Sequence, residues 1–324
     1  IASKNTIVTV AGNGSLGFAD GDGATARFYQ PTGIALDAAG NMYVADSENN
    51  RIRKITSAGI VSTLAGSGTA GSSDGIGTAA QFYSPRAVAV DAANNIYVVD
   101  GGNHKIRKIA SDGTVTTLAG SGDYGFADGD GTTAQFYFPK GIALDASGNI
   151  YVADDINNRI RKITPTGIVT TLAGSSPGST DGIGTAAQFR SPRGITVDAT
   201  GNIYIADAGN HRIRMITPDG TVSTIAGNGV GVTDGAVAVA KFNTPAGIVL
   251  DAAGNIYVAD DENERIRKIT PGGVVSTLAG GFLAGFTDGV GGNAQFNSPT
   301  GLAIDGSGNI YVADRHNHSI RKIQ

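Results

Sequence analysis

Pro31-Thr-Gly-Ile-Ala-Leu-Asp37, Gly40-Asn-Met-Tyr-Val-Ala-Asp46, Arg51-Ile-Arg-Lys-Ile55 and Ile60-Val-Ser-Thr-Leu-Ala-Gly66 follow one another near the start of the chain. Close copies of this series recur along the 324 residues, and each copy opens on a proline: Pro31, Pro85, Pro139, Pro192, Pro245 and Pro299. The period is therefore 53 or 54 residues. A repeat of this length is typical of solenoids, propellers and arrays, so the architecture has to be settled before any site is interpreted.

Each unit contains four short runs rich in Val, Ile, Tyr and Thr, separated by Gly, Asn and Asp. This pattern predicts a four-stranded antiparallel meander, whose strands we name a to d from the proline onward. One meander cannot bury both of its faces, so the units are expected to stack around a channel. The chain ends in strand c of the sixth unit and starts with an unpartnered strand d, Ile7-Val-Thr-Val-Ala-Gly12.

The sequence thus predicts an all-β, six-bladed β-propeller with four-stranded antiparallel blades, closed by pairing of the N-terminal strand with the last blade. We expect a single domain over residues 1–324. Its repeats cover residues 31–66, 85–120, 139–174, 192–227, 245–280, and 299–324 together with 5–12.

Composition narrows the functional classes. The absence of cysteine excludes disulfides and thiolate metal sites, and no apolar run approaches the 18 residues of a membrane span. A formal net charge of -4 disfavours a general nucleic-acid binder. The chain begins with Ile1 and shows no signal peptide, which suggests a mature form or a segment of a longer protein.

Three segments of the third unit carry a family resemblance. Gly141-Ile-Ala-Leu-Asp145, Gly148-Asn-Ile-Tyr-Val-Ala-Asp154 and Asn157-Asn-Arg-Ile-Arg-Lys-Ile163 resemble the NHL-repeat β-propellers, and the likeness extends to all six units. The segment Asp20-Gly-Asp-Gly-Ala-Thr-Ala-Arg-Phe-Tyr-Gln-Pro31 is similar to bacterial secreted or cell-surface members. The resemblance implies a binding or scaffold role and an extracellular location, while distant relatives are lyases.

Positions that recur in every unit are interpreted as structural. We expect one set of arginines to lie between blades and to donate hydrogen bonds to carboxylates or carbonyls, because an unpaired buried guanidinium is costly. A set of aspartates is repeated with equal regularity. The arginines are Arg53, Arg107, Arg161, Arg214, Arg267 and Arg321, and the aspartates are Asp37, Asp91, Asp145, Asp198, Asp251 and Asp305.

Two further patterns could suggest metals. The pairs Asp20/Asp22 and Asp128/Asp130 resemble calcium loops, but the other four units keep only one carboxylate, so a capped turn that ends in a buried Phe is the favoured interpretation. Whether calcium binds at these pairs stays open.

The histidines His104, His211 and His318 occupy equivalent turns spread around the ring. The spacing of strands places these turns on the order of 20 Å from one another, so the three histidines cannot share one zinc ion. The sequence predicts no catalytic residue, metal site or cofactor.

Specificity is expected where the units differ. Basic and aromatic residues gather at the beginning of strand a in units one to four, and unit five places Asp261, Glu262 and Glu264 between strands b and c. Because strand a is innermost in a propeller, the basic and aromatic side chains should surround one mouth of the channel. The predicted ligand-binding residues are Tyr29, Tyr83, Arg86, Tyr137, Phe138, Lys140, Arg190 and Arg193.

We therefore expect a monomeric, non-enzymatic binding module that holds a protein, peptide or glycan on the face carrying the long loops between strands d and a. The alternatives are a lyase- or lactonase-type propeller enzyme, and a purely structural scaffold that is natural, recently amplified or engineered. The basic and aromatic residues would also suit single-stranded RNA as a ligand. The negative net charge of the protein argues against RNA binding.

Overall fold

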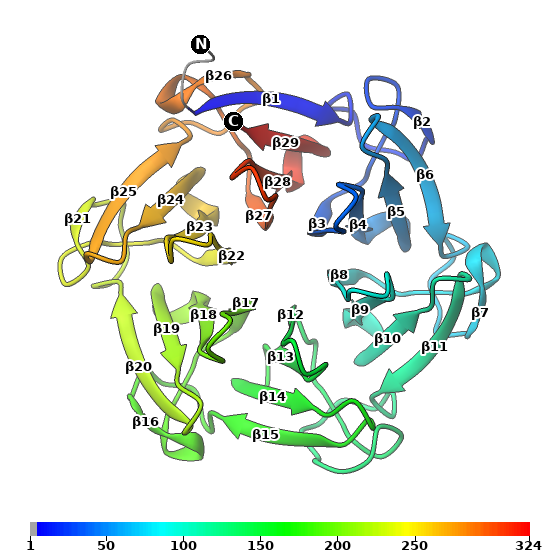
Figure 1. Cartoon of the computed structure of the whole chain (residues 1–324), viewed down its shortest axis with the longest axis horizontal. Helices are drawn as coiled ribbons and strands as arrows, with labels where there is room; N and C mark the ends of the chain where they lie inside the picture. The colour runs from blue at the N-terminus through cyan, green and yellow to red at the C-terminus, as the bar shows by residue number, and fades with distance from the viewer. Residues whose placement is uncertain (1–4) are drawn as a thin grey trace.

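Six twisted β-sheets surround a central channel in the computed structural model, which describes residues 5–324 (Figure 1). Strand a of each blade lies next to the channel, and strands b, c and d follow outward in antiparallel order. The innermost strands are β3 (Pro31–Leu36), β8 (Pro85–Val90), β12 (Gly141–Leu144), β17 (Pro192–Val197), β22 (Pro245–Leu250) and β27 (Pro299–Ile304).

The other three strands of each blade keep nearly constant lengths. Strands b are β4 (Met42–Asp46), β9 (Ile96–Asp100), β13 (Ile150–Asp154), β18 (Ile203–Asp207), β23 (Ile256–Asp260) and β28 (Ile310–Asp314). Strands c are β5 (Arg51–Ile55), β10 (Lys105–Ile109), β14 (Arg159–Ile163), β19 (Arg212–Ile216), β24 (Arg265–Ile269) and β29 (Ser319–Ile323). Strands d are β6 (Ile60–Ala65), β11 (Thr114–Ala119), β15 (Val169–Ala173), β20 (Thr221–Ala226), β25 (Val274–Ala279) and, from the chain start, β1 (Thr6–Ala11).

A short fifth strand covers the outer edge of five blades, a feature that the sequence did not predict. It comes from the linker that crosses from the preceding blade, and it pairs with strand d. These strands are β2 (Gly21–Asp22), β7 (Gly75–Ile76), β16 (Gly182–Ile183), β21 (Gly235–Ala236) and β26 (Gly289–Val290). In the third blade a single bridge between Gly129 and Val169 takes this place. This additional strand leaves fewer unpaired backbone groups at the outer edge of the blade.

The ring is closed as predicted, by strands from the two ends of the chain. β1 pairs antiparallel with β29, with Ile7 opposite Ile323 and Thr9 opposite Arg321. β1 therefore supplies strand d of the sixth blade, and β26 pairs on its other side. Ile7 is fully buried in the core of that blade.

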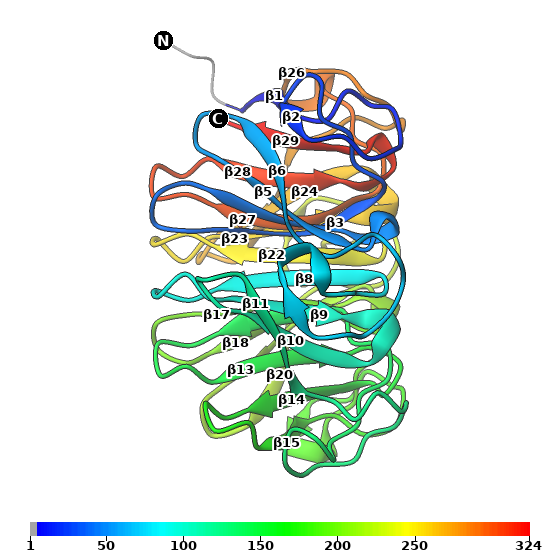
Figure 2. The ribbon, with the colours of Figure 1, turned by 90° about the vertical axis from the view of Figure 1, so that its right-hand side faces the viewer.

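The two ends of the channel differ (Figure 2). One end carries the tight hairpins between strands a and b and between c and d. The other end, which we call the loop face, carries the turns between strands b and c and the ends of the linkers. Five of these turns contain a 3-10 helix: η1 (Ser47–Asn49), η3 (Gly101–Asn103), η5 (Ala208–Asn210), η6 (Asp261–Asn263) and η8 (Arg315–Asn317).

The linkers contain the remaining helical segments: η2 (Gly77–Ala79), η4 (Gly184–Ala186) and η7 (Gly291–Asn293). None of the helices within residues 5–324 is long and apolar enough to cross a membrane.

The repeated arginines hold the linkers against the blades. In the first blade Arg53 Nη1 donates to Asp46 Oδ2 at 2.8 Å, and Nη2 donates to Asp20 Oδ1 at 2.6 Å. The guanidinium also bonds two linker carbonyls and lies 5.0 Å from the ring centroid of Phe28, a buried residue in the cluster that joins the first and last blades. The same arrangement recurs in all six blades, so the predicted acceptors for these arginines are confirmed.

The aspartates that end the strands b accept hydrogen bonds from the linker as well as from their own blade. Asp46 Oδ1 accepts from the linker N–H of Tyr29 at 2.8 Å, while Oδ2 accepts from Asn49 and Arg53. Each aspartate therefore joins its turn, its strand c and the linker. The other repeated aspartates, such as Asp37, close the hairpin between strands a and b by accepting from Asn41.

Neighbouring blades are also connected by a hydrogen bond between two residues with left-handed backbone. The residue that ends each turn between b and c accepts, through its side chain, from the backbone N–H of the residue before the next blade's proline. His104 Nδ1 accepts from Phe138 at 3.1 Å, and Asn50 Oδ1 accepts from Ser84 at 2.9 Å. We call this contact the blade clip. Its acceptors are Asn50, His104, Asn158, His211, Glu264 and His318.

Candidate functional site

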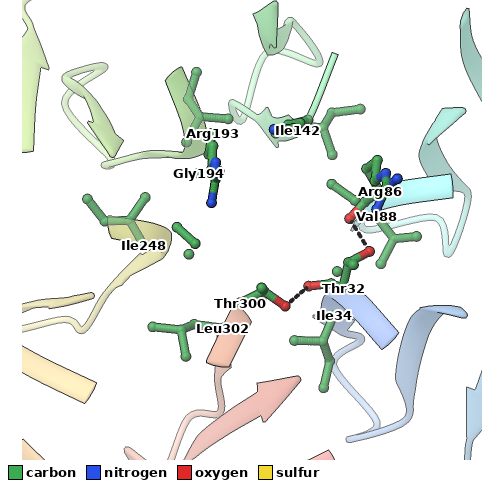
Figure 3. A pocket seen from close by; sticks show the side chains of 18 of the residues that line it. Thr32, Ile34, Arg86, Val88, Ile142, Arg193, Gly194, Ile248, Thr300 and Leu302 are labelled. Atoms are coloured by element: carbon green, nitrogen blue, oxygen red, sulfur yellow. Dashed lines mark hydrogen bonds between the residues drawn. The ribbon is translucent and has the colours of Figure 1, made fainter. Parts of the chain in front are cut away.

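The loop-face mouth of the channel encloses a cavity of about 270 Å³, walled by the six strands a. Glycine lies two residues after five of the six repeated prolines and lets the innermost strands pack closely: a Cβ on Gly194 would lie 2.1 Å from the carbonyl oxygen of Ala246 in the next blade. Below this level the wall is apolar (Figure 3). Its side chains are Ile34, Val88, Ile142, Ile195, Ile248 and Leu302.

Two sets of six residues form the rim above this wall. The residue after each repeated proline contributes Thr32, Arg86, Lys140, Arg193, Ala246 and Thr300. The first residue of each turn between b and c forms the second set, of which Arg315 lines the cavity: Ser47, Gly101, Asp155, Ala208, Asp261 and Arg315. Since strand a and this turn meet on the loop face of the same blade, the two residues of a blade are potential partners.

Two rim cations have carboxylate partners. Lys140 Nζ lies 2.6 Å from Asp155 Oδ2 within the third blade, and Arg193 Nη1 lies 3.0 Å from Asp261 Oδ2 of the fifth blade. Both carboxylates are buried, with relative exposures of 1% and 3%. Asp155 keeps its buried Oδ1 without a hydrogen-bond donor among the described residues. Burial lowers the pKa of Lys140, Asp155 opposes that effect, and the charge of Arg193 adds to it.

Arg86 has no such partner. Its counterpart in the turn of the second blade is Gly101, where a Cβ would lie only 2.7 Å from Arg86 Cγ. Within residues 5–324 the Arg86 guanidinium forms no ion pair, and its buried Nε has no hydrogen-bond partner. The guanidinium lies 5.4 Å from the ring centroid of Phe138. Burial lowers the pKa of Arg86, the positive charges of Arg315 and Arg193 lower it further, and the negative charge of Glu48 opposes these effects.

The rim is therefore positive in a protein whose formal net charge is -4. Four cations, Arg86, Lys140, Arg193 and Arg315, face two carboxylates. Arg315 donates to the neutral Gln30 Oε1 at 3.0 Å. Apolar walls reduce solvent screening, so the field of the surplus charge is concentrated at this mouth.

The structure divides the eight predicted site residues into two groups. Arg86, Phe138, Lys140 and Arg193 line the cavity together. The others lie outside it on the loop face: Tyr29 stands edge-on to His318, Tyr83 packs on Gly102, Arg190 packs on Gly209, and Tyr137 contacts His104. Whether any of the eight binds a ligand stays a prediction.

Sequence reasoning missed Arg315 and Asp155 as rim residues. The signal was present in the first residue of each turn between b and c, which differs from blade to blade more than the rest of the turn does. The ion pair between Arg193 and Asp261 could not be predicted from the sequence, because its two residues belong to different blades.

A line of aromatic rings leads from the cavity outward over the second and third blades. Phe138 lines the cavity, and its ring centroid is 6.2 Å from that of His104. His104 is 5.7 Å from Tyr137, and Tyr137 is 5.1 Å from Tyr124. Tyr124 is 69% exposed and Tyr137 36% exposed. We call these four residues the aromatic track.

The fifth blade contributes an acidic segment to the same face. Glu264 occupies the clip position, and its Oε2 accepts from the N–H of Ser298 at 2.5 Å. Burial is the main cause that raises the pKa of Glu264 to about 7, and the charges of Asp261 and Asp314 act in the same direction. The loop face is thus polarised, with unpaired positive charge at the mouth and acidic groups towards the fifth blade.

The aspartates considered for calcium are held by protein donors. Asp20 and Asp128 accept from Arg53 and Arg161, at 2.6 and 2.7 Å. Asp22 accepts from Thr25, and Asp130 from two threonines. Over residues 5–324 no cluster of three or more His, Cys, Asp or Glu is arranged to hold a metal ion.

Comparisons with known proteins agree with this architecture. The NHL repeat model matches residues 28–55, 82–109, 189–214, 242–269 and 296–323, and the Teneurin NHL domain model matches residues 122–181. The chain is 35% identical to Protein SUPPRESSOR OF QUENCHING 1, chloroplastic, of Arabidopsis thaliana, over 81% of this chain and 27% of that protein. It spans less than half the length of the NHL repeat-containing relatives that it matches.

Solved structures share the fold. An auxiliary nutrient binding protein from Bacteroides thetaiotaomicron superposes with a TM-score of 0.77 at 19% identity, covering 99% of this chain and 76% of that one. Virginiamycin B lyase from Staphylococcus aureus superposes with a TM-score of 0.57 at 15% identity, covering 91% and 95%. At these identities the likeness concerns the fold alone.

Proposed function

The chain belongs to the NHL-repeat β-propellers, and on that premise we propose that it is a non-enzymatic binding module that holds an anionic group of its ligand at the loop-face mouth. The observation that carries the proposal is Arg86, a half-buried arginine whose guanidinium forms no ion pair among residues 5–324 and lies near the cations Arg193 and Arg315. A buried cation without a partner costs free energy, and a bound anion would offset that cost.

The geometry of the mouth supports an anion in particular. Hydrogen bonds between a guanidinium and an anionic oxygen are stronger than neutral ones, and the apolar wall below reduces competition from water. Lys140 and Arg193 are already neutralised by carboxylates, which directs the ligand's charge towards Arg86 and Arg315. The polarised loop face would orient a ligand with one charged end.

Calorimetry with D-glucuronate, N-acetylneuraminate, inorganic phosphate and sulfate tests the proposal. We expect at least one of these anions to bind, and Arg86→Gln to weaken its binding about tenfold or more, since a hydrogen bond to a charged group is lost. Arg27→Gln is the matched control, because Arg27 is an exposed arginine away from the cavity. Its affinity should equal that of the parent.

A second variant tests the cause. Gly101→Ala adds the Cβ that would meet Arg86 Cγ, and alanine already occupies the equivalent position 208 in the fourth blade. We expect it to fold normally and to weaken anion binding by moving the Arg86 side chain. If no anion binds the parent, or if binding survives Arg86→Gln unchanged, the proposed function is wrong.

The enzyme alternative rests on the lyase-like fold and on Glu264, whose raised pKa of about 7 suits proton transfer. Glu264 lies outside the cavity-lining set, and its carboxylate already accepts a backbone hydrogen bond. We therefore favour binding over catalysis. Turnover of lactone or depsipeptide substrates that is lost in Glu264→Gln, with or without added divalent metal, would favour the enzyme.

We also propose that the module acts outside the bacterial cell. The support is its fold similarity to the nutrient binding protein of Bacteroides, while the chloroplastic relative points to other locations within the family. Fractionation of source cells with an antibody against the propeller checks this. Recovery of the protein in the cytosol alone would contradict it.

A further inference from the structure

The aromatic track points to the chemical class of the ligand. Resting on the proposed function, we propose that the site takes an oligosaccharide with one acidic sugar at its end. The acidic group occupies the mouth beside Arg86, and the following neutral sugar rings lie along Phe138, Tyr137 and Tyr124. Four observations support this assignment.

The first is the continuity of the track with the anion site. Arg86 contacts the ring of Phe138, and successive rings continue outward at centroid spacings between 5.1 and 6.2 Å. Tyr137 and Tyr124 are inclined to each other by only 32° at a centroid distance of 5.1 Å, so the two rings stack with an offset, and Tyr124 still exposes 69% of its surface. Sugar rings have apolar C–H faces that pack on such surfaces, and the tyrosine hydroxyls supply polar partners at the edges.

The second is the backbone of Phe138. The residue before each blade's proline has a left-handed backbone, which disfavours bulky side chains. Five of these six positions carry short or polar residues: Gln30, Ser84, Ser191, Thr244 and Ser298. The third blade alone places an aromatic ring there, with φ of 52°. A bulky residue kept in this conformation at the wall of a cavity indicates a functional requirement.

The third is the composition of the surrounding face. The residues two positions before the repeated prolines are three tyrosines, one arginine and two asparagines: Tyr29, Tyr83, Tyr137, Arg190, Asn243 and Asn297. This set offers ring faces and hydrogen-bonding groups but no aliphatic side chain. A peptide is usually anchored by apolar side chains in pockets, so this composition suits sugars better.

The fourth is the distribution of charge along the track. The unpaired cation lies at the inner end, while the exposed Asp123 is next to Tyr124 at the outer end. Single-stranded RNA would bring a phosphate beside every stacked base, and a uniformly acidic glycan would bring a carboxylate on every sugar. Both would meet Asp123. A single terminal acid followed by neutral sugars fits the observed charges.

Calorimetry on the full chain, comparing each acidic oligosaccharide with its own acidic monosaccharide, tests the inference. Suitable pairs are sialyllactose with N-acetylneuraminate, and glucuronate-capped xylotriose with D-glucuronate. We expect at least one oligosaccharide to bind about tenfold more tightly than its monosaccharide, because its neutral sugar rings also pack on the track. Lactose and xylotriose, which lack the acid, should bind at least tenfold more weakly than the capped forms.

Variants separate this inference from the proposed function. The double variant Tyr124→Ala, Tyr137→Ala should remove the advantage of the oligosaccharide and leave the monosaccharide affinity unchanged. Tyr43→Phe is the control: Tyr43 is a buried tyrosine that does not line the cavity. Phe138→Ser should weaken oligosaccharide binding and raise the melting temperature, since serine occupies this position in three other blades.

The outcomes are distinct. If a monosaccharide binds but no oligosaccharide gains affinity, or if the tyrosine variant keeps the gain, the inference is overturned and the proposed function stands. If no anion binds at all, the proposed function fails first. Tighter binding of an oligouridylate or of a peptide ending in glutamate than of every acidic oligosaccharide also overturns it.

Discussion

Gly101 determines the chemistry of the rim because it lacks the side chain that pairs with the residue after the repeated proline in the first and third blades. In the third blade the equivalent Asp155 neutralises Lys140, and in the first blade Ser47 shares a hydrogen bond with Thr32 at 2.6 Å. Arg86 faces a position without a side chain and keeps its guanidinium free of an ion pair within the described residues. A deviation of one residue in one repeat thus converts a structural position into a candidate binding group.

Glu264 gives a prediction at this scale. Its folded-state pKa of about 7 lies above the ordinary value of 4.5, so the charged form is less favourable in the folded protein. The cost of this charge is absent at low pH, where the group is protonated in both states, and grows as pH rises from about 4.5 to 7. Glu264→Asn, which copies Asn50 and Asn158 at the clip, should therefore increase the free energy of unfolding at pH 8 by about 1 kcal/mol.

Urea unfolding at pH 8 and pH 5 measures this effect, and the gain should shrink at the lower pH. Glu48→Gln, at an exposed glutamate, should change stability little at either pH. A variant that is less stable than the parent at pH 8 would contradict the assigned cost of the Glu264 charge.

The sequence could predict the structural residues better than the rim residues. Arg53 and its equivalents recur six times, so packing was the natural interpretation, and the buried ion pairs confirm it. The charge of the rim depends on which turn residue contacts which residue at the start of strand a. Arg193 reaches a different blade to find Asp261, and this pairing follows from the three-dimensional arrangement of the ring, which a one-dimensional comparison of repeats does not contain.

At the scale of the secondary-structure element, the blade clip explains why histidine is accepted at three turns. His104, His211 and His318 each accept a backbone hydrogen bond at Nδ1, which requires the neutral ring. Burial lowers the pKa of all three. Asparagine makes the same contact in the first and third blades without titrating.

The clip therefore predicts a pH-dependent difference between variants. The pKa of each histidine is lower in the folded protein than its value of 6.5 in the unfolded chain. The unfolded state therefore binds protons more readily, and the free energy of unfolding decreases as pH falls below 6.5. The triple variant His104→Asn, His211→Asn, His318→Asn should match the parent near pH 8. At pH 5 it should be more stable than the parent by about 1 kcal/mol or more in total, after solvent screening is discounted.

Chemical unfolding of both proteins from pH 8 to pH 5 gives the comparison, and the other titrating groups cancel in the difference. A difference that stays constant over this range would show that the clip histidines do not titrate differently in the folded and unfolded states.

At the scale of the whole molecule, stability depends on the closure of the ring. The linkers and blade clips join each blade to the next, and β1 makes the last of these connections. The regular spacing of the prolines and the position of one strand d before the first blade were enough to predict this closure. The additional edge strands were not predictable, because two residues such as Gly75 and Ile76 carry no strand pattern of their own.

Deletion of residues 1–11 should therefore lower the melting temperature and promote self-association, because it exposes the edge of β29 and the core that Ile7 covers. Differential scanning calorimetry and analytical ultracentrifugation measure the two effects. A synthetic peptide of residues 1–11, added in excess, should restore the melting temperature. A truncated protein that remains monomeric and equally stable would show that the strand is dispensable.

The pairing of β1 with β29 also constrains biosynthesis. Ile7 leaves the ribosome more than three hundred residues before its partner Ile323. At about 5–20 residues per second, the early strand waits for tens of seconds without its partner. Five blades can assemble in order during translation, but the sixth can form only when synthesis reaches its last strand. The growing propeller is therefore most vulnerable to proteases and to wrong strand pairing at β1 and at the unfinished sixth blade, and a chaperone that shields β1 would raise the yield of finished rings.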